Sequence, residues 1–76
     1  MDRSKYIMVG TSTINRMSVD ELERDVWWIA ENGLEVKVDS FYFDNGSGDT
    51  YLIYEIFNNR HQHKIDAFDL FLIPKE

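Results

Sequence analysis

The stretch Ser18–Gly33, SVDELERDVWWIAENG, carries the strongest local structural signal in the chain. Ser18 is followed three residues later by Glu21, which is the pattern of a capping box at the start of a helix. In that motif each of the two side chains accepts a hydrogen bond from the backbone N–H of the other residue. Gly33 can adopt the left-handed conformation that ends many helices. The stretch therefore predicts one long helix over Ser18–Asn32.

This predicted helix has an apolar side and a charged side. At about 100° per residue, the apolar arc, which should face the core, comprises Val19, Leu22, Val26, Ile29 and Ala30. Trp28 falls on the opposite side, among the acids Glu21, Asp25 and Glu31. Because tryptophan is enriched at interface hot spots, Trp28 and these three acids are candidate partner-binding residues. The alternative is that Trp28 is a surface ring shielded by Arg24.

The rest of the chain predicts four strands. They are expected over Lys5–Thr13, Leu34–Asp44, Thr50–Asn58 and Ile65–Ile73. Asn45-Gly46 predicts a hairpin turn between the second and third strands, and the apolar alternation of the second strand slips near Asp39–Ser40. The fold class predicted for residues 1–76 is α+β, as a single small domain. One helix packs on a mainly antiparallel four-stranded sheet, in the order strand, helix, strand, strand, strand.

Large apolar side chains lie on both faces of the predicted sheet. The core on the helix side is expected to contain Leu22, Val26, Ile29, Val36, Val38, Leu52, Tyr54, Ile56, Leu70 and Leu72. The side chains left on the second face are Tyr42, Tyr51, Ile53, Phe57 and Phe71. One helix cannot cover both faces, so the second face is predicted to contact a partner protein or a second copy of the chain. In the alternative, the N-terminal segment and the loops fold over it.

The charge balance narrows the classes of partner. The 76 residues include 14 acids and 8 bases, which gives a net charge of −6. Direct binding to nucleic acid is disfavoured, because it depends on Lys and Arg neutralising phosphates, whereas an acidic surface suits a basic partner. There is no cysteine for a disulfide or a thiolate metal site. No stretch resembles a signal-peptide core or a membrane span, so a soluble, cytoplasmic protein without membrane contact is expected.

One group of residues resembles a metal site. His61 and His63 would point the same way on an extended segment, and Asp66 follows as a third ligand type. The neighbouring cations Arg60 and Lys64 oppose metal binding, and the chain has no further His or Cys to complete the coordination. No nucleophile with a histidine and an acid is recognisable either. The sequence therefore predicts no catalytic residue, no bound metal and no cofactor.

Together these observations favour a non-enzymatic function. The protein is expected to be a small acidic inhibitor or adaptor that binds a larger protein. In the more specific version of this hypothesis, the larger protein is basic and binds nucleic acid. Small size, acidic charge and a two-sided apolar sheet also occur in phage-encoded inhibitor proteins. The chain is similar to them in these general properties, but it shares no sequence motif with them. Two alternatives stay open. One is a self-associating structural module that forms a homodimer through the second face, and the weaker one is a metal-dependent enzyme.

Overall fold

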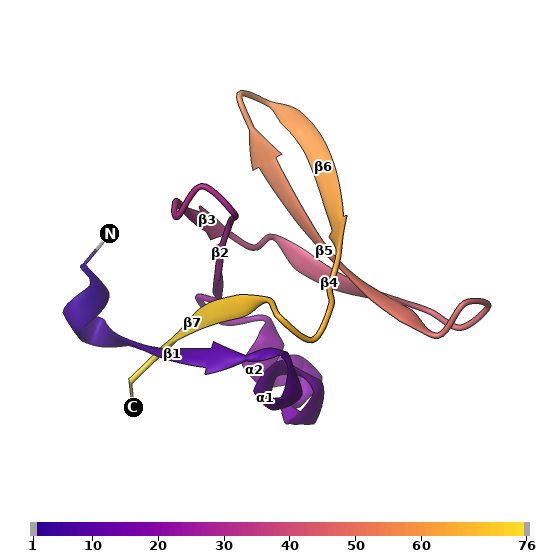
Figure 1. The fold of residues 1–76 in the computed structure, drawn as a ribbon, viewed down its shortest axis with the longest axis horizontal. Coiled ribbons are helices and arrows are strands. Elements are labelled where there is room, and N and C mark those ends of the chain that lie inside the picture. The colour runs from indigo at the N-terminus through magenta and orange to yellow at the C-terminus, as the bar shows by residue number, and fades with distance from the viewer. Residues whose placement is uncertain (1, 76) are drawn as a thin grey trace.

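In the computed structural model, which describes residues 2–75, the chain forms two antiparallel sheets and short helices (Figure 1). The first sheet has the strand order β1-β7-β2-β3, and the second has the order β4-β5-β6. The strands are β1 Tyr6–Gly10, β2 Trp27–Ile29, β3 Glu35–Lys37, β4 Ser40–Asp44, β5 Asp49–Ile56, β6 Asn59–Lys64 and β7 Leu70–Pro74. The helical elements are the 3-10 turn η1 Arg3–Lys5, α1 Thr11–Arg16 and α2 Val19–Leu22. The predicted class of mixed helix and sheet is confirmed. The predicted architecture, a single helix on one four-stranded sheet, agrees only roughly with the two sheets and short helices of the structure.

The long helix predicted over Ser18–Asn32 is wrong, because α2 ends at Leu22 and β2 occupies Trp27–Ile29. The capping box itself is present. Ser18 Oγ accepts from the Glu21 backbone N–H at 3.2 Å, and Glu21 Oε1 accepts from the Ser18 N–H at 3.1 Å. The residues of β2, two tryptophans and an isoleucine, fit a strand well. Since β2 pairs with both β3 and β7, tertiary pairing outweighs the helical periodicity of this stretch.

Removal of the cap should weaken the fold measurably. Ser18→Ala deprives the Glu21 N–H of its acceptor, so we expect the free energy of unfolding to fall by about 1 kcal/mol, measured by urea denaturation. Ser12→Ala, a serine on the exposed side of α1, is the matched control and should change it by less than about 0.5 kcal/mol. Equal effects of the two substitutions would contradict the role assigned to the cap.

The slip in alternation near Asp39–Ser40 marks the passage of the chain from one sheet to the other. The Val38 N–H donates to Val26 O at 3.0 Å, next to the first sheet. The next N–H, that of Asp39, donates to Ile53 O of β5 at 2.8 Å. The predicted second strand is therefore two strands, β3 and β4, that belong to different sheets. The hairpin turn predicted at Asn45-Gly46 joins β4 to β5 as expected.

Three other predicted boundaries differ. The first strand ends at Gly10 and α1 follows it, and β7 begins only at Leu70. The segment His61–His63, which is outside the four predicted strands, lies within β6. β4, β5 and β6 form a meander, whereas β7 returns to the first sheet between β1 and β2. Gly33 has a positive φ of 86°, but it lies in the turn between β2 and β3 and does not end a helix.

The core lies between the two sheets, with one side chain from α1. Its buried residues are Ile14, Val26, Trp28, Val38, Leu52 and Phe71. Leu72, next to Phe71 in β7, is also buried but lies outside this cluster. Val26, Val38, Leu52 and Leu72 are thus confirmed from the predicted set. Leu22, Val36 and Tyr54 pack against the core while partly buried, and Ile29 is also partly buried. Ile56 and Leu70 were wrongly predicted, since both are exposed. Ile14, Trp28 and Phe71 were missed because their burial depends on α1 and on the first sheet.

Candidate functional site

The outer face of the three-stranded sheet, defined by Tyr42, Tyr51 and Ile53, is directed away from the core. In the sheet register Tyr42 lies opposite Tyr51, and Ile53 lies opposite Ser40. Leu52, between Tyr51 and Ile53, is fully buried, and alternate residues of a strand point to opposite faces. The rings of Tyr42 and Tyr51 have their centroids 6.2 Å apart. Three of the predicted partner-binding residues therefore share one surface.

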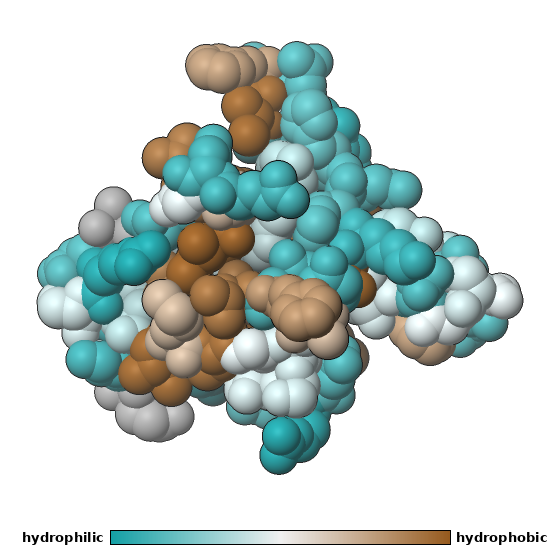
Figure 2. Space-filling view, in the orientation of Figure 1, coloured by the Kyte–Doolittle hydropathy of each residue, from teal (hydrophilic) through white to brown (hydrophobic). Residues whose placement is uncertain are grey.

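Phe57 lies at the tip of the β5–β6 hairpin, where a two-residue loop joins the paired Ile56 and Asn59. Its side chain is 92% exposed. Phe57 and Asn58 have φ values of 52° and 65°, as in a type I′ turn, in which Asn-Gly is the preferred pair. Figure 2 shows apolar colour at this tip, at the top of the view. Neither packing nor backbone preference accounts for a phenylalanine at this position.

Phe71 does not belong to the outer face, which corrects the prediction. It lies in β7 of the first sheet, where its register partners are Val9 of β1 and Trp28 of β2. Its side chain is fully buried, and its ring centroid is 6.3 Å from that of Phe41. The prediction failed because alternation within one strand does not reveal that the strand is central in another sheet.

The outward placement of Trp28 is also wrong. Its side chain is 7% exposed, because Trp28 belongs to β2 and not to a helix. The indole Nε1–H donates to Asp69 Oδ1 at 3.1 Å, and the ring stacks on His63 with centroids 4.4 Å apart. Trp28 also contacts Tyr54 of β5, with centroids 5.6 Å apart. It therefore joins the two sheets and is not available as an exposed anchor.

The predicted acids lie apart from the outer face. Glu21 is exposed on α2, where its carboxylate completes the capping box with Ser18. The bonds from the Ser18 backbone N–H and hydroxyl hold the pKa of the Glu21 carboxyl below its ordinary value. Glu31 is exposed in the turn between β2 and β3. The structure therefore distributes these acids and does not gather them beside Tyr42.

The carboxylate of Asp25 contacts side chains from three strands of the first sheet. Trp27 Nε1 donates to Asp25 Oδ1 at 2.8 Å, Lys37 Nζ lies 3.1 Å from the same oxygen, and the Tyr6 hydroxyl donates to Asp25 Oδ2. Partial burial opposes ionisation of Asp25, but these partners outweigh it and lower the pKa of the carboxyl. The same carboxylate raises the pKa of the Tyr6 hydroxyl. Asp25 thus connects β1, β2 and β3.

The residues of the predicted metal alternative do not converge. His63 Nε2 lies 3.0 Å from Asp69 Oδ2, and that oxygen also accepts from the Asp66 backbone N–H at 2.8 Å. The ring of His61 stacks on Tyr54, with centroids 5.2 Å apart. Between residues 2 and 75, no group of three or more His, Cys, Asp or Glu residues is arranged to hold a metal ion. The histidines pack on aromatic rings of the fold.

An open hollow that no sequence pattern predicted lies on the opposite side of β4 from the outer face. We call it the apolar groove, and it lies between the helices and the β4–β5 hairpin. Its apolar lining is Ile14, Met17, Val19, Leu22, Phe41 and Phe43. Val19 and Phe43 are 70% and 56% exposed. The prediction of a long helix hid this groove, because it placed Val19 in a buried stripe.

Comparisons of the chain with protein-family models, with curated proteins and with solved structures found no match. Within residues 2–75, no helix has the length and apolar character needed to cross a bilayer. The fold and its surfaces define a small acidic protein of mixed helix and sheet that exposes aromatic side chains.

Proposed function

We propose that this protein is a non-enzymatic inhibitor or adaptor that binds a larger protein through the outer face and the Phe57 tip. Phe57 supports this proposal most directly. Left-handed backbone costs an L-residue roughly 1–2 kcal/mol, and strained positions of this kind concentrate at sites of function. A phenylalanine that is both strained and 92% exposed stabilises nothing within the chain. A pocket on a partner would bury it.

The proposed partner is a basic protein. More specifically, we propose a basic protein that binds nucleic acid. The net charge of −6 favours encounter with a positively charged surface and disfavours encounter with phosphates. Charge complementarity of this kind governs association rate and orientation, while aromatic anchors supply most of the binding energy. The aromatic side chains Tyr42, Tyr51 and Phe57 would then provide the affinity.

A homodimer is the second candidate. It would form through the outer face, where Tyr42, 51% exposed, and its register partner Tyr51 present aromatic surface that a second copy could bury. Light scattering at several concentrations separates the candidates, because a monomer across the range excludes a dimer of useful affinity. A dimer that Tyr42→Ser dissociates would favour self-association.

Phe57→Asn should change stability and binding in opposite directions. Asparagine tolerates the left-handed conformation, so we expect the free energy of unfolding to rise by about 0.5–1 kcal/mol. Loss of an aromatic hot spot should weaken binding to the basic protein captured from a lysate by about 30-fold, the equivalent of roughly 2 kcal/mol. Urea denaturation and titration calorimetry with the purified captured protein measure the two effects.

Phe68→Asn is the matched control for this experiment. Phe68 is equally exposed, at 90%, but it lies in the loop between β6 and β7, away from the tip. It should leave binding within about twofold of the wild type, which is within the range of near-neutral contacts. Unchanged binding of Phe57→Asn would contradict the proposed function, as would capture of proteins with no excess of basic residues.

A further inference from the structure

The apolar groove remains open because one of its walls, the β4–β5 hairpin, is long and the other, α2, is short. The β4–β5 hairpin projects beyond the helices (Figure 1), so the side of β4 that faces the core is covered at Phe41 but not at Phe43. On the other wall α2 is only four residues long, and it leaves Val19 70% exposed. Apolar side chains from α1, α2 and β4 thus line one hollow that stays open to solvent at Val19 and Phe43.

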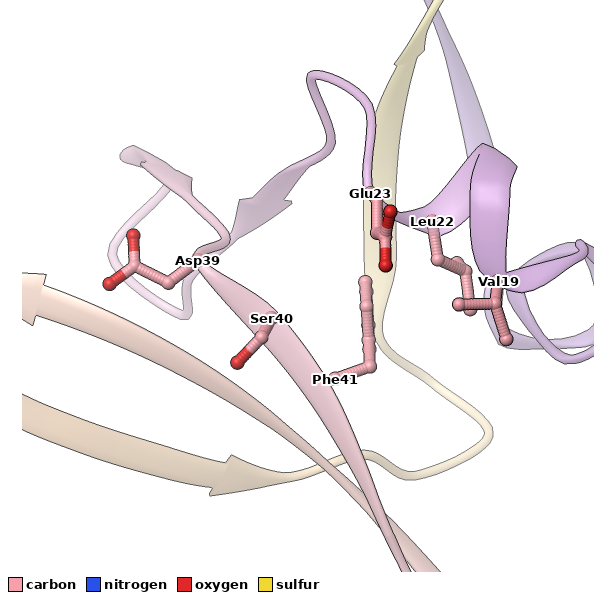
Figure 3. A pocket seen from close by; sticks show the side chains of 6 residues that line it. All are labelled: Val19, Leu22, Glu23, Asp39, Ser40 and Phe41. Carbon is pink, nitrogen blue, oxygen red and sulfur yellow. The ribbon is translucent and has the colours of Figure 1, made fainter.

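The charge in the groove has one sign. Its smaller end, of about 150 Å³, is lined by Val19, Leu22, Glu23, Asp39, Ser40 and Phe41 (Figure 3). The larger end, of about 500 Å³, is lined by uncharged residues. In Figure 3 the Glu23 side chain is directed toward Phe41, whereas the Asp39 carboxylate points away from Phe41 and from the helix. Neither carboxylate has an ion-pair partner among the residues that the structure describes.

We propose that the apolar groove is a second docking site, which binds an amphipathic basic segment of a partner protein. An apolar side chain of the segment lies against Val19, Phe41 and Phe43, and a lysine or arginine beside it pairs with Glu23. An unpaired carboxylate next to exposed apolar surface is complementary to such a segment, and it opposes an acidic one by like-charge repulsion. This site goes beyond the proposed function, because it lies on the opposite side of β4 from the outer face.

A peptide titration followed by NMR tests this proposal without the natural partner. The probe is a 14-residue helical peptide of leucine and lysine with one apolar face, and the wild-type protein is labelled with 15N. We expect the backbone amide shifts to change mainly over residues 19–23 and 40–43. A peptide with glutamate in place of lysine, and one with serine in place of leucine, should each produce no saturable change.

Single substitutions then separate specific pairing from general attraction. Glu23→Gln should weaken binding of the leucine–lysine peptide by about twofold to fivefold, the range for one exposed ion pair. Asp20→Asn is the matched control and should change binding less. Asp20 lies on α2 and is exposed, as Glu23 is at the C-cap of that helix, but Asp20 does not line the groove. Val19→Ser, at a position that is already exposed, should weaken binding while the circular dichroism spectrum stays unchanged.

Several results would overturn the proposal. They are no saturable binding of the leucine–lysine peptide, equal binding of the glutamate peptide, shift changes centred on Tyr42 and Tyr51, and equal effects of Glu23→Gln and Asp20→Asn. None of them bears on Phe57, so failure of this site is distinguishable from failure of the proposed function.

Discussion

Phe71→Ala is expected to lower the free energy of unfolding by about 4 kcal/mol, the typical cost of deleting a buried phenylalanine ring. Phe71 is fully buried in β7, the strand that pairs with both β1 and β2. Its ring also meets Phe41 of the second sheet. Truncation would therefore leave a cavity where the two sheets pack, and strands held by hydrogen bonds on both sides cannot easily move to close it.

Urea denaturation of Phe71→Ala and Phe68→Ala measures this effect with a built-in control. Phe68 is three residues away but 90% exposed, so its truncation should change the free energy of unfolding by less than about 0.5 kcal/mol. A 76-residue domain has roughly 4–11 kcal/mol of total stability by the usual scaling per residue. Phe71→Ala is thus expected to be close to unfolded in the least stable case. A loss of under about 1 kcal/mol would show that the sheets do not pack through Phe71.

Asp69→Ala is expected to lower the free energy of unfolding by about 3 kcal/mol, because it removes the acceptor of the partly buried Trp28 indole N–H and of the Asp66 backbone N–H, and the partner of His63. The Asp69 carboxylate accepts from Trp28 Nε1–H of β2 and from the Asp66 N–H, and it lies 3.0 Å from His63 Nε2 of β6. One side chain, only 12% exposed, therefore connects the two sheets. Asp66→Ala, a more exposed carboxylate in the same loop, should cost clearly less in the same urea experiment.

The ionisation of Asp69 gives this prediction a pH dependence. Partial burial opposes the charged form, but the hydrogen bonds from the Asp66 N–H, His63 and Trp28 outweigh it and lower the pKa of the carboxyl. The unfolded chain then binds a proton at higher pH than the folded protein does, so this stabilisation is present above the unfolded pKa of about 3.9. It is lost as the pH falls through the lower folded pKa.

Urea denaturation between pH 7 and pH 2.5 tests the direction of this effect. We expect the stability of the wild type to decline below about pH 4. Asp69→Asn lacks the titrating group and should decline less steeply over the same range. Parallel pH profiles of the two proteins would contradict the role of the Asp69 charge. Asp2, Glu21 and Asp25 also have lowered pKa values, so the difference between the two profiles, and not the wild-type profile alone, reports on Asp69.

The candidate site was predictable where it depends on strand alternation alone. Tyr42, Tyr51 and Ile53 share a face because side chains alternate along a strand and the Asn45-Gly46 turn sets the pairing of β4 with β5. Alternation along the strand also assigned Phe57 to the same side of the sheet as Tyr51 and Ile53. Its strained backbone was not predictable, because φ depends on the two-residue loop that the pairing of β5 with β6 imposes.

Local patterns were sufficient to predict the features that neighbouring residues control. These are the capping box at Ser18, the hairpin turn at Asn45-Gly46, the break near Asp39–Ser40 and the mixed helix-and-sheet class, together with the acidic charge. Each depends on hydrogen bonds, turn preferences or composition within a few residues, so a local pattern is sufficient to predict it.

The choice between helix and strand for Trp27–Ile29 depends on long-range contacts. The periodicity of this stretch fits a helix, but β7 returns from the far end of the chain and pairs with it. Pairing across some forty residues satisfies backbone hydrogen bonds and buries Trp28 and Phe71 together, which outweighs a local helical preference worth fractions of a kcal/mol per residue. The same pairing ends α2 early and leaves Val19 exposed beside Phe43. The apolar groove therefore results from long-range contacts that no local pattern specifies.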